Sequence, residues 1–230
     1  MIQQDQLESG AGSVQREEFF TAARGRAHVF DFLATLLNRR PDLDLVRTLR
    51  ANSLDELIGQ AEASEPDSQV VQGLKEMAQF VETTAAEPET GIETALGVDW
   101  TRLFRGVTPR YGPPPPYESI YIDTGETELA TIQSVNEFYL NSGAMLEKTA
   151  GNRPDYLGLE LGFLSFLAEE EAKAWEAGDE VLARSYQEKA RSFFEQHPGA
   201  WASKFLTEAL NYAKTGFYTG FLYLCLGTLN

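Results

Sequence analysis

The chain has 230 residues, 43% of them hydrophobic and 23% charged, which is typical of a globular protein long enough to bury a core. Its 35 acidic and 19 basic residues give a formal net charge of −16, which argues against nucleic acid or an anionic membrane surface as the partner and favours a basic one. An acidic surface can also serve solubility alone.

The cysteine and histidine content limits the metal and redox chemistry that is possible. Two histidines and one cysteine are too few for the usual zinc sites, and one cysteine cannot form an intrachain disulfide. Cys225 lies in the apolar segment FLYLCLG, so we expect it to be a buried core residue. The N-terminal segment has no basic region followed by an apolar one, and the most apolar stretch, residues 216–229, is shorter than the roughly 20 residues of a membrane span. We therefore predict a cytoplasmic protein that uses no metal and no cofactor.

The first hundred residues show helical periodicity after a polar start. Residues 1–15 predict a flexible N-terminal tail, and residues 16–230 are expected to form the folded domain. From Arg16, apolar residues recur at steps of three and four, which predicts a helix that ends at Arg39-Arg40-Pro41. Further helices are expected at residues 43–49, 53–63, 67–84 and 91–105.

Four consecutive prolines then interrupt the helical pattern, in the segment YGPPPPYESIY (111–121). Proline lacks a backbone N–H and has a fixed φ, so the run cannot continue a helix and favours an extended polyproline II conformation. We predict a proline-rich hinge loop near residues 106–118, between two helical halves. The run and its tyrosines could wall an apolar groove together with the aromatic helix face before it, or could form a plain connector whose aromatic residues belong to the core. Residues 114–117 also match PPxY, a short ligand pattern of WW domains.

Helical periodicity resumes after this loop. One helix is expected at 126–146, and Asp155 is well placed to cap the next. That helix is apolar on nearly all sides as far as Leu167, which predicts a position at the centre of a bundle, while the run Glu169–Glu171 is expected to face solvent. Helices at 180–196, 200–212 and 214–229 complete the chain. The fold class predicted is all-α, a single-domain bundle of about nine to eleven helices.

Motifs of catalysis are missing from the sequence. No P-loop or GxGxxG follows a strand, and neither His28 nor His197 has the glutamate three residues before it that a di-iron bundle uses. We predict no catalytic residues and no metal ligands, and expect a binding surface instead.

Four segments, in their order and spacing, resemble a known family. They are WTRLFRG (100–106), PPPPYESIYID (113–123), RPDYLGLELGFLSFLAEE (153–170) and FFEQHPGAWASKFLTEAL (193–210). Together they resemble the signatures of the TorD/DmsD/NarJ family of all-helical cytoplasmic chaperones. The resemblance implies a protein that binds the N-terminal signal segment, commonly of the twin-arginine type, of an apo molybdopterin oxidoreductase. It also implies that the chaperone assists folding and cofactor insertion before export.

The resemblance assigns signal-peptide-binding residues in three groups. They are Trp100, Leu103 and Phe104; Pro115, Pro116, Tyr117 and Ser119; and Asp155, Tyr156, Gly158 and Glu160.

Two carboxylates in the last group leave alternatives open. Asp155 could cap its helix or pair with a client arginine. Glu160, between two leucines, is costly to bury alone and needs an internal partner such as an arginine, or a ligand. Tyr156 stands where many members of the family have histidine, and a tyrosine does not titrate near neutral pH. His197 is expected to be a helix-end residue.

Other functions fit the same pattern. The protein could be a NarJ-like assembly chaperone for a non-exported metalloenzyme, or a nucleotide-hydrolysing enzyme that lacks the usual phosphate motif. A proline hinge between two helical halves is compatible with a monomer or with a domain-swapped dimer.

Overall fold

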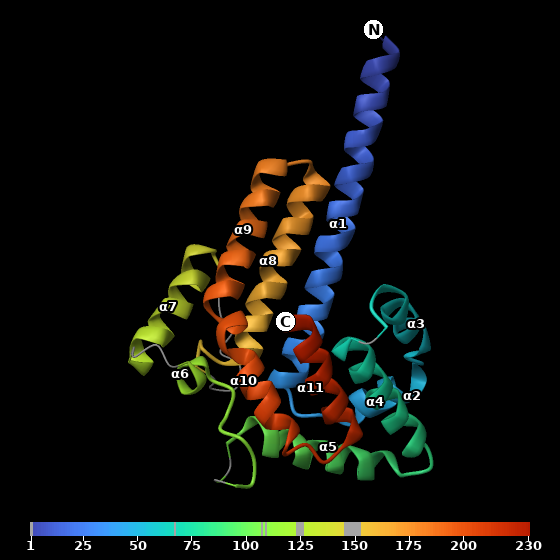
Figure 1. Ribbon diagram of the computed structural model, residues 1–230, viewed down its shortest axis with the longest axis vertical. Coiled ribbons are helices and arrows are strands. Elements are labelled where there is room, and N and C mark those ends of the chain that lie inside the picture. The colour runs from blue at the N-terminus through green and yellow to red at the C-terminus, as the bar shows by residue number, and fades with distance from the viewer. Residues whose placement is uncertain (1, 67, 107, 109, 123–126, 145–152) are drawn as a thin grey trace.

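The computed structural model describes residues 2–66, 68–106, 108, 110–122, 127–144 and 153–230, with side chains from Val14 onward. These residues form eleven helices and no strand longer than one isolated bridge, so the predicted all-α fold is confirmed (Figure 1). The helices are α1 (Ile2–Asn38), α2 (Leu43–Ala51), α3 (Asp55–Ser64), α4 (Gln69–Thr83), α5 (Glu89–Phe104), α6 (Glu118–Tyr121), α7 (Glu128–Asn141), α8 (Leu157–Ala177), α9 (Glu180–Gln196), α10 (Pro198–Leu210) and α11 (Gly216–Leu229).

The backbone of α1 is helical from Ile2, where the sequence predicts a loose tail. The flexibility of residues 1–15 and a domain boundary at residue 16 stay predictions. The predicted hinge loop corresponds to the connection between α5 and α6, of which residues 107 and 109 lie outside the described residues.

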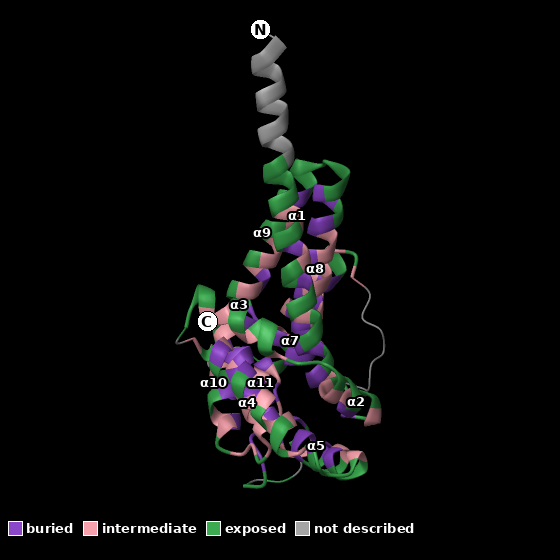
Figure 2. Cartoon of the chain, turned by 90° about the vertical axis from the view of Figure 1, so that its right-hand side faces the viewer, coloured by how far each residue is buried: buried purple, intermediate pink, exposed green. Residues whose placement is uncertain are grey.

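Helix α8 lies between α1 and α9, at the centre of the largest helical layer (Figure 1). Its apolar residues occur on all sides, and most of them are buried, as predicted for a central helix. Buried residues follow the α1–α8 contact and gather again where α4, α10 and α11 meet (Figure 2).

Glu171 corrects the expectation that the whole run Glu169–Glu171 faces solvent. Its side chain is buried because it lies on the side of α8 that packs against α1. There its carboxylate accepts a hydrogen bond from Arg26 Nη2 at 2.7 Å and another from the indole Nε1 of Trp175 at 3.2 Å. A buried carboxylate with two such donors is compatible with the core.

Helices α4 and α11 pack with their backbones in close contact through glycines. A Cβ atom added to Gly220 would lie 2.5 Å from the carbonyl oxygen of Gly73 and 2.9 Å from the backbone nitrogen of Met77. Only a residue without a side chain allows this approach, so the glycines determine how near α11 comes to α4.

Gly220→Ala is therefore expected to destabilise the protein by about 1–3 kcal/mol, the usual cost of overpacking. Gly25→Ala is the matched control, because Gly25 lies in α1 with nothing within 4 Å of its added Cβ. Helix propensity alone should then stabilise the control by about 0.5–1 kcal/mol. Urea unfolding of both variants measures the change in the free energy of unfolding, and a change of the same sign in both would contradict the close packing.

Other helices cover α11, chiefly α4, α10 and α5, and its apolar residues are therefore buried. Cys225 in this helix is fully buried, as predicted, and burial raises the pKa of its thiol. Within the described part of the chain, each helix is too short or too polar to cross a bilayer.

Asp99 in α5 joins this helix to the start of α11 and is almost fully buried. Its carboxylate accepts hydrogen bonds from the backbone nitrogens of Lys214 (2.9 Å) and Thr215 (2.8 Å), and from the Thr215 hydroxyl (2.8 Å). Arg102 Nη1 donates a fourth bond at 2.7 Å. A carboxylate near a helix N-terminus is further stabilised by the unpaired N–H groups there.

Candidate functional site

Two of the predicted motifs meet in space. Tyr117 and Tyr156 form an antiparallel bridge, in which the backbone nitrogen of Glu118 donates to the carbonyl of Asp155 at 2.9 Å. The backbone nitrogen of Leu157 donates to the carbonyl of Pro116 at 3.0 Å. We call this region, residues 115–119 and 153–158, the hinge junction. It anchors the C-terminal end of the proline loop to the start of α8.

Asp155 is the fully buried carboxylate of the hinge junction. Its Oδ2 accepts a hydrogen bond from the Ser119 hydroxyl at 2.6 Å and a longer one from the Ser119 backbone nitrogen at 3.3 Å. Arg153 also reaches it, with Nη2 3.4 Å from Oδ2 and Nε 3.3 Å from Oδ1. The expectation that Asp155 caps α8 is wrong: the residue at the cap position is Tyr156, without a side-chain cap bond, because the turn directs the Asp155 carboxylate toward Ser119.

Tyr117 lies half-buried next to this carboxylate. Its ring centroid is 5.3 Å from that of Tyr156, and the guanidinium carbon of Arg153 lies 4.3 Å from it. The ring and the Asp155 carboxylate thus contact one guanidinium group from two directions, through a cation–π contact and an ion pair.

Tyr156 and Gly158 connect the hinge junction to the end of α1. Tyr156 is fully buried and donates its hydroxyl hydrogen to the carbonyl of Leu37 at 2.8 Å. Burial raises its pKa, an effect that the nearby Arg105 opposes, so it stays neutral at ordinary pH. The carbonyl of Gly158 accepts a hydrogen bond from Asn38 Nδ2 at 2.8 Å.

The residues predicted on α5 belong to the core. Leu103 and Phe104 are 0% and 1% exposed and Trp100 is 8% exposed, so the interpretation of this face as an exposed groove wall is wrong for this structure. The Trp100 indole donates to the carbonyl of Leu36 at 3.1 Å, and the Phe104 ring packs edge-on against Tyr218 at 5.6 Å. Their regular spacing puts them on the side of α5 that other helices cover. A role for them in client binding stays a prediction, and their truncation would disturb the fold as well as any binding.

A pocket of about 410 Å³ does lie along the prolines. Its second wall comes from Glu208 in α10 and Tyr212 in the turn after it, and not from the aromatic residues of α5. Tyr121 stabilises the loop here by donating its hydroxyl hydrogen to the carbonyl of Pro114 at 2.9 Å. The pocket is lined by Gly106, Thr108, Arg110, Gly112, Pro113, Pro114, Pro115, Glu208 and Tyr212.

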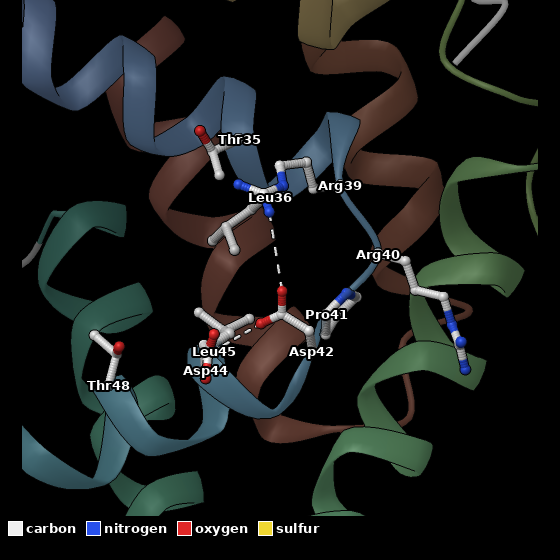
Figure 3. A pocket seen from close by; sticks show the side chains of 9 residues that line it. All are labelled: Thr35, Leu36, Arg39, Arg40, Pro41, Asp42, Asp44, Leu45 and Thr48. Atoms are coloured by element: carbon white, nitrogen blue, oxygen red, sulfur yellow. Dashed lines mark hydrogen bonds and ion pairs between the residues drawn. The ribbon is translucent and has the colours of Figure 1, made fainter. Parts of the chain in front are cut away.

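A second pocket, of about 330 Å³, lies between the end of α1 and the start of α2. Arg39 and Asp42 face each other across it at 3.9 Å, while Arg40 points away toward α5 (Figure 3). None of the predicted binding residues lines this pocket.

A buried polar cluster behind the hinge junction was only partly foreseen. Glu160 is fully buried and accepts a hydrogen bond from the indole Nε1 of Trp201 at 3.1 Å. The pKa of Glu160 lies well above its usual range, because burial and the neighbouring Glu118 both disfavour a negative charge on the Glu160 carboxylate. Glu160 thus has internal partners, as one alternative required, but they are not the expected arginine.

Glu118 and His197 are the members of this cluster that the sequence did not assign. His197 Nδ1 lies 2.9 Å from Glu118 Oε2, and both side chains are almost fully buried. His197 does end a helix, as expected, since it lies between α9 and α10. The pairing itself spans 79 positions, so no local sequence signal could have indicated it.

Comparison with known proteins identifies the family. Among the described residues, no group of three or more His, Cys, Asp or Glu side chains is placed to hold a metal ion. The comparison with curated proteins finds no match. The family model described as nitrate reductase delta subunit matches residues 60–207, which include the hinge junction, the proline loop and the buried cluster. Because this match covers more than half of the chain, the protein belongs to the nitrate reductase delta subunit family, whose members are chaperones of molybdoenzyme assembly.

Proposed function

We propose that this protein is a cytoplasmic chaperone that binds the N-terminal, twin-arginine type signal segment of an apo molybdopterin oxidoreductase. By holding that segment it assists folding and cofactor insertion before export. Its partners are the signal segment and the apo-enzyme, and it acts as a monomer or as a domain-swapped dimer. The nucleotide-hydrolysing alternative is not retained, because members of the family are assembly factors and not catalysts.

The observation that carries this proposal is the meeting of two motifs beside a pocket. The hinge junction presents Tyr117 and the Asp155 carboxylate to a guanidinium group, and the neighbouring pocket combines proline rings with Glu208. A signal segment with a basic part and an apolar part offers complementary groups to both. The net charge of −16 adds long-range attraction for a basic peptide.

A synthetic peptide with two adjacent arginines followed by an apolar segment is the direct probe of this proposal. Calorimetry should give a measurable Kd for the wild-type protein. Glu208→Gln, which removes one negative charge from the pocket wall, is expected to weaken binding by about three- to tenfold, or about 0.6–1.4 kcal/mol.

Glu188→Gln is the matched control for that substitution. It removes the same charge from an exposed position on α9, where Glu188 pairs with Arg191. Its effect on Kd should stay within about twofold, because exposed charges act weakly at a distance in salt. Equal effects of the two substitutions would exclude the proline pocket from the binding surface.

An assembly chaperone for a non-exported metalloenzyme is the second candidate, and it is equally compatible with the family match. Affinity purification of the tagged protein from its native cells, with identification of the large subunit that co-purifies, separates the two. A client with a twin-arginine leader supports the first candidate, and a client without one supports the second.

A further inference from the structure

Arg153 makes an unusual set of contacts within the hinge junction. Its guanidinium carbon lies 4.3 Å from the centroid of the Tyr117 ring, and its Nη2 donates to the Ser119 hydroxyl at 3.0 Å. The same group pairs with Asp155 and, through Nη1, with Glu128. An aromatic face with a carboxylate and a hydroxyl at its edge has the features of a binding site for a planar guanidinium cation.

The fit between Arg153 and this site is incomplete. Arg153 Nε and Asp155 Oδ1 form an ion pair at 3.3 Å, yet neither buried atom has a hydrogen-bond partner among the residues that the structure describes. Only Pro154 separates the two residues, so the short connection restricts how the guanidinium can align with the carboxylate. The Asp155 side chain is fully buried, and a carboxylate oxygen that accepts no hydrogen bond carries a substantial desolvation cost. A guanidinium from outside, free of this restriction, could pair with both carboxylate oxygens.

We propose that Tyr117, Ser119 and Asp155 form a guanidinium cage that Arg153 occupies in the free protein, and that an arginine of the client segment displaces Arg153 on binding. The displaced side chain is already one-third exposed, and Glu128 beside it is 62% exposed, so Arg153 can turn outward and keep a carboxylate partner in water. This inference rests on the proposed function and adds that Arg153 competes with the client arginine for the same site. Binding then requires an arginine in particular, because a lysine ammonium offers neither the planar face nor the paired donors.

The first test compares two peptides on two proteins. One peptide has two adjacent arginines before its apolar segment, and the other has two lysines at the same positions. If Arg153 fills the cage in nine of ten molecules, Arg153→Ala should raise the arginine-over-lysine affinity ratio by about tenfold relative to the wild type. The ratio cancels the general electrostatic gain from losing a positive charge.

A second variant distinguishes the loss of a competing guanidinium from a folding defect in Arg153→Ala. Arg153→Lys conserves the charge but cannot fill the planar site, so it should raise the same ratio by a smaller factor. Asp155→Asn in the Arg153→Ala background removes the cage carboxylate and should lower the ratio to the wild-type value or below it. An unchanged ratio in both Arg153 variants, or weaker binding of both peptides to them, would overturn the displacement.

A small probe tests the cage without any client peptide. Ethylguanidinium at millimolar concentration should raise the Tm of Arg153→Ala by a few degrees and leave that of the wild type unchanged, whereas ethylammonium at equal ionic strength should affect neither. Rescue by ethylguanidinium together with no peptide binding would uphold the cage and reject the signal-segment function. Peptide binding with an unchanged ratio and no rescue would reject the cage and leave that function standing.

Discussion

Asp99→Ala is expected to lower the free energy of unfolding by about 3–5 kcal/mol, the cost of removing one partner from a buried charged network. The substitution leaves the backbone N–H groups of Lys214 and Thr215 without an acceptor at the start of α11. It also leaves Arg102, whose side chain is only 15% exposed, without its carboxylate. Urea unfolding followed by circular dichroism measures the change.

Asp44→Ala is the control for this experiment. Asp44 also pairs with an arginine at helical spacing, Arg47, but its side chain is 87% exposed. The expected loss is within about 0.5 kcal/mol, since exposed ion pairs contribute little. If both substitutions had similar small effects, Asp99 would not be the connection between α5 and α11 that its hydrogen bonds indicate.

Glu160→Gln is expected to change how stability depends on pH. The folded protein holds a proton on Glu160 at pH values where the unfolded chain, with a pKa near 4.5, has released it. Stability from this group is therefore complete below about pH 4.5 and is lost as pH rises toward the raised pKa. Glutamine resembles the protonated acid in shape and can still accept from Trp201, so the variant escapes that loss.

The free energy of unfolding of Glu160→Gln minus that of the wild type should thus grow by about 1.4 kcal/mol for each pH unit within this window. Urea titrations at a series of pH values measure the difference, in which the acidic residues that do not interact with Glu160 cancel. Glu188→Gln, at an exposed position beside Arg191, should show no such growth. A difference for Glu160→Gln that stays constant with pH would mean that this carboxyl titrates like an exposed one.

The hinge junction also bears on the oligomeric state. The contacts that tie the proline loop to α8 pair backbone groups of residues 116–118 with those of residues 155–157. Both segments lie at or beyond the C-terminal end of the connection between α5 and α6, so a domain swap about the earlier part of that connection would keep these contacts within one chain. Size-exclusion chromatography with light scattering distinguishes the two states.

The sequence by itself determined the fold class and the position at which the proline loop interrupts the helices. Steps of three and four between apolar residues predicted the helices, since a buried stripe on a helix has that period. The apolar run of residues 157–167 predicted the central helix, and four prolines predicted the loop because proline cannot continue a helix. Family signatures also identified the two segments that form the hinge junction.

Only the tertiary structure decided which side chains are accessible and which are paired. The spacing of Trp100 and Phe104 puts them on one helical face, which could equally line a groove or face the core. In the structure other helices pack over this face, so both side chains are buried in the core. Asp99 with Thr215 and Glu118 with His197 are 116 and 79 positions apart, so their pairing depends on how whole helices dock. Burial, desolvation and hydrogen bonding are properties of that docking, and local periodicity carries no information about them.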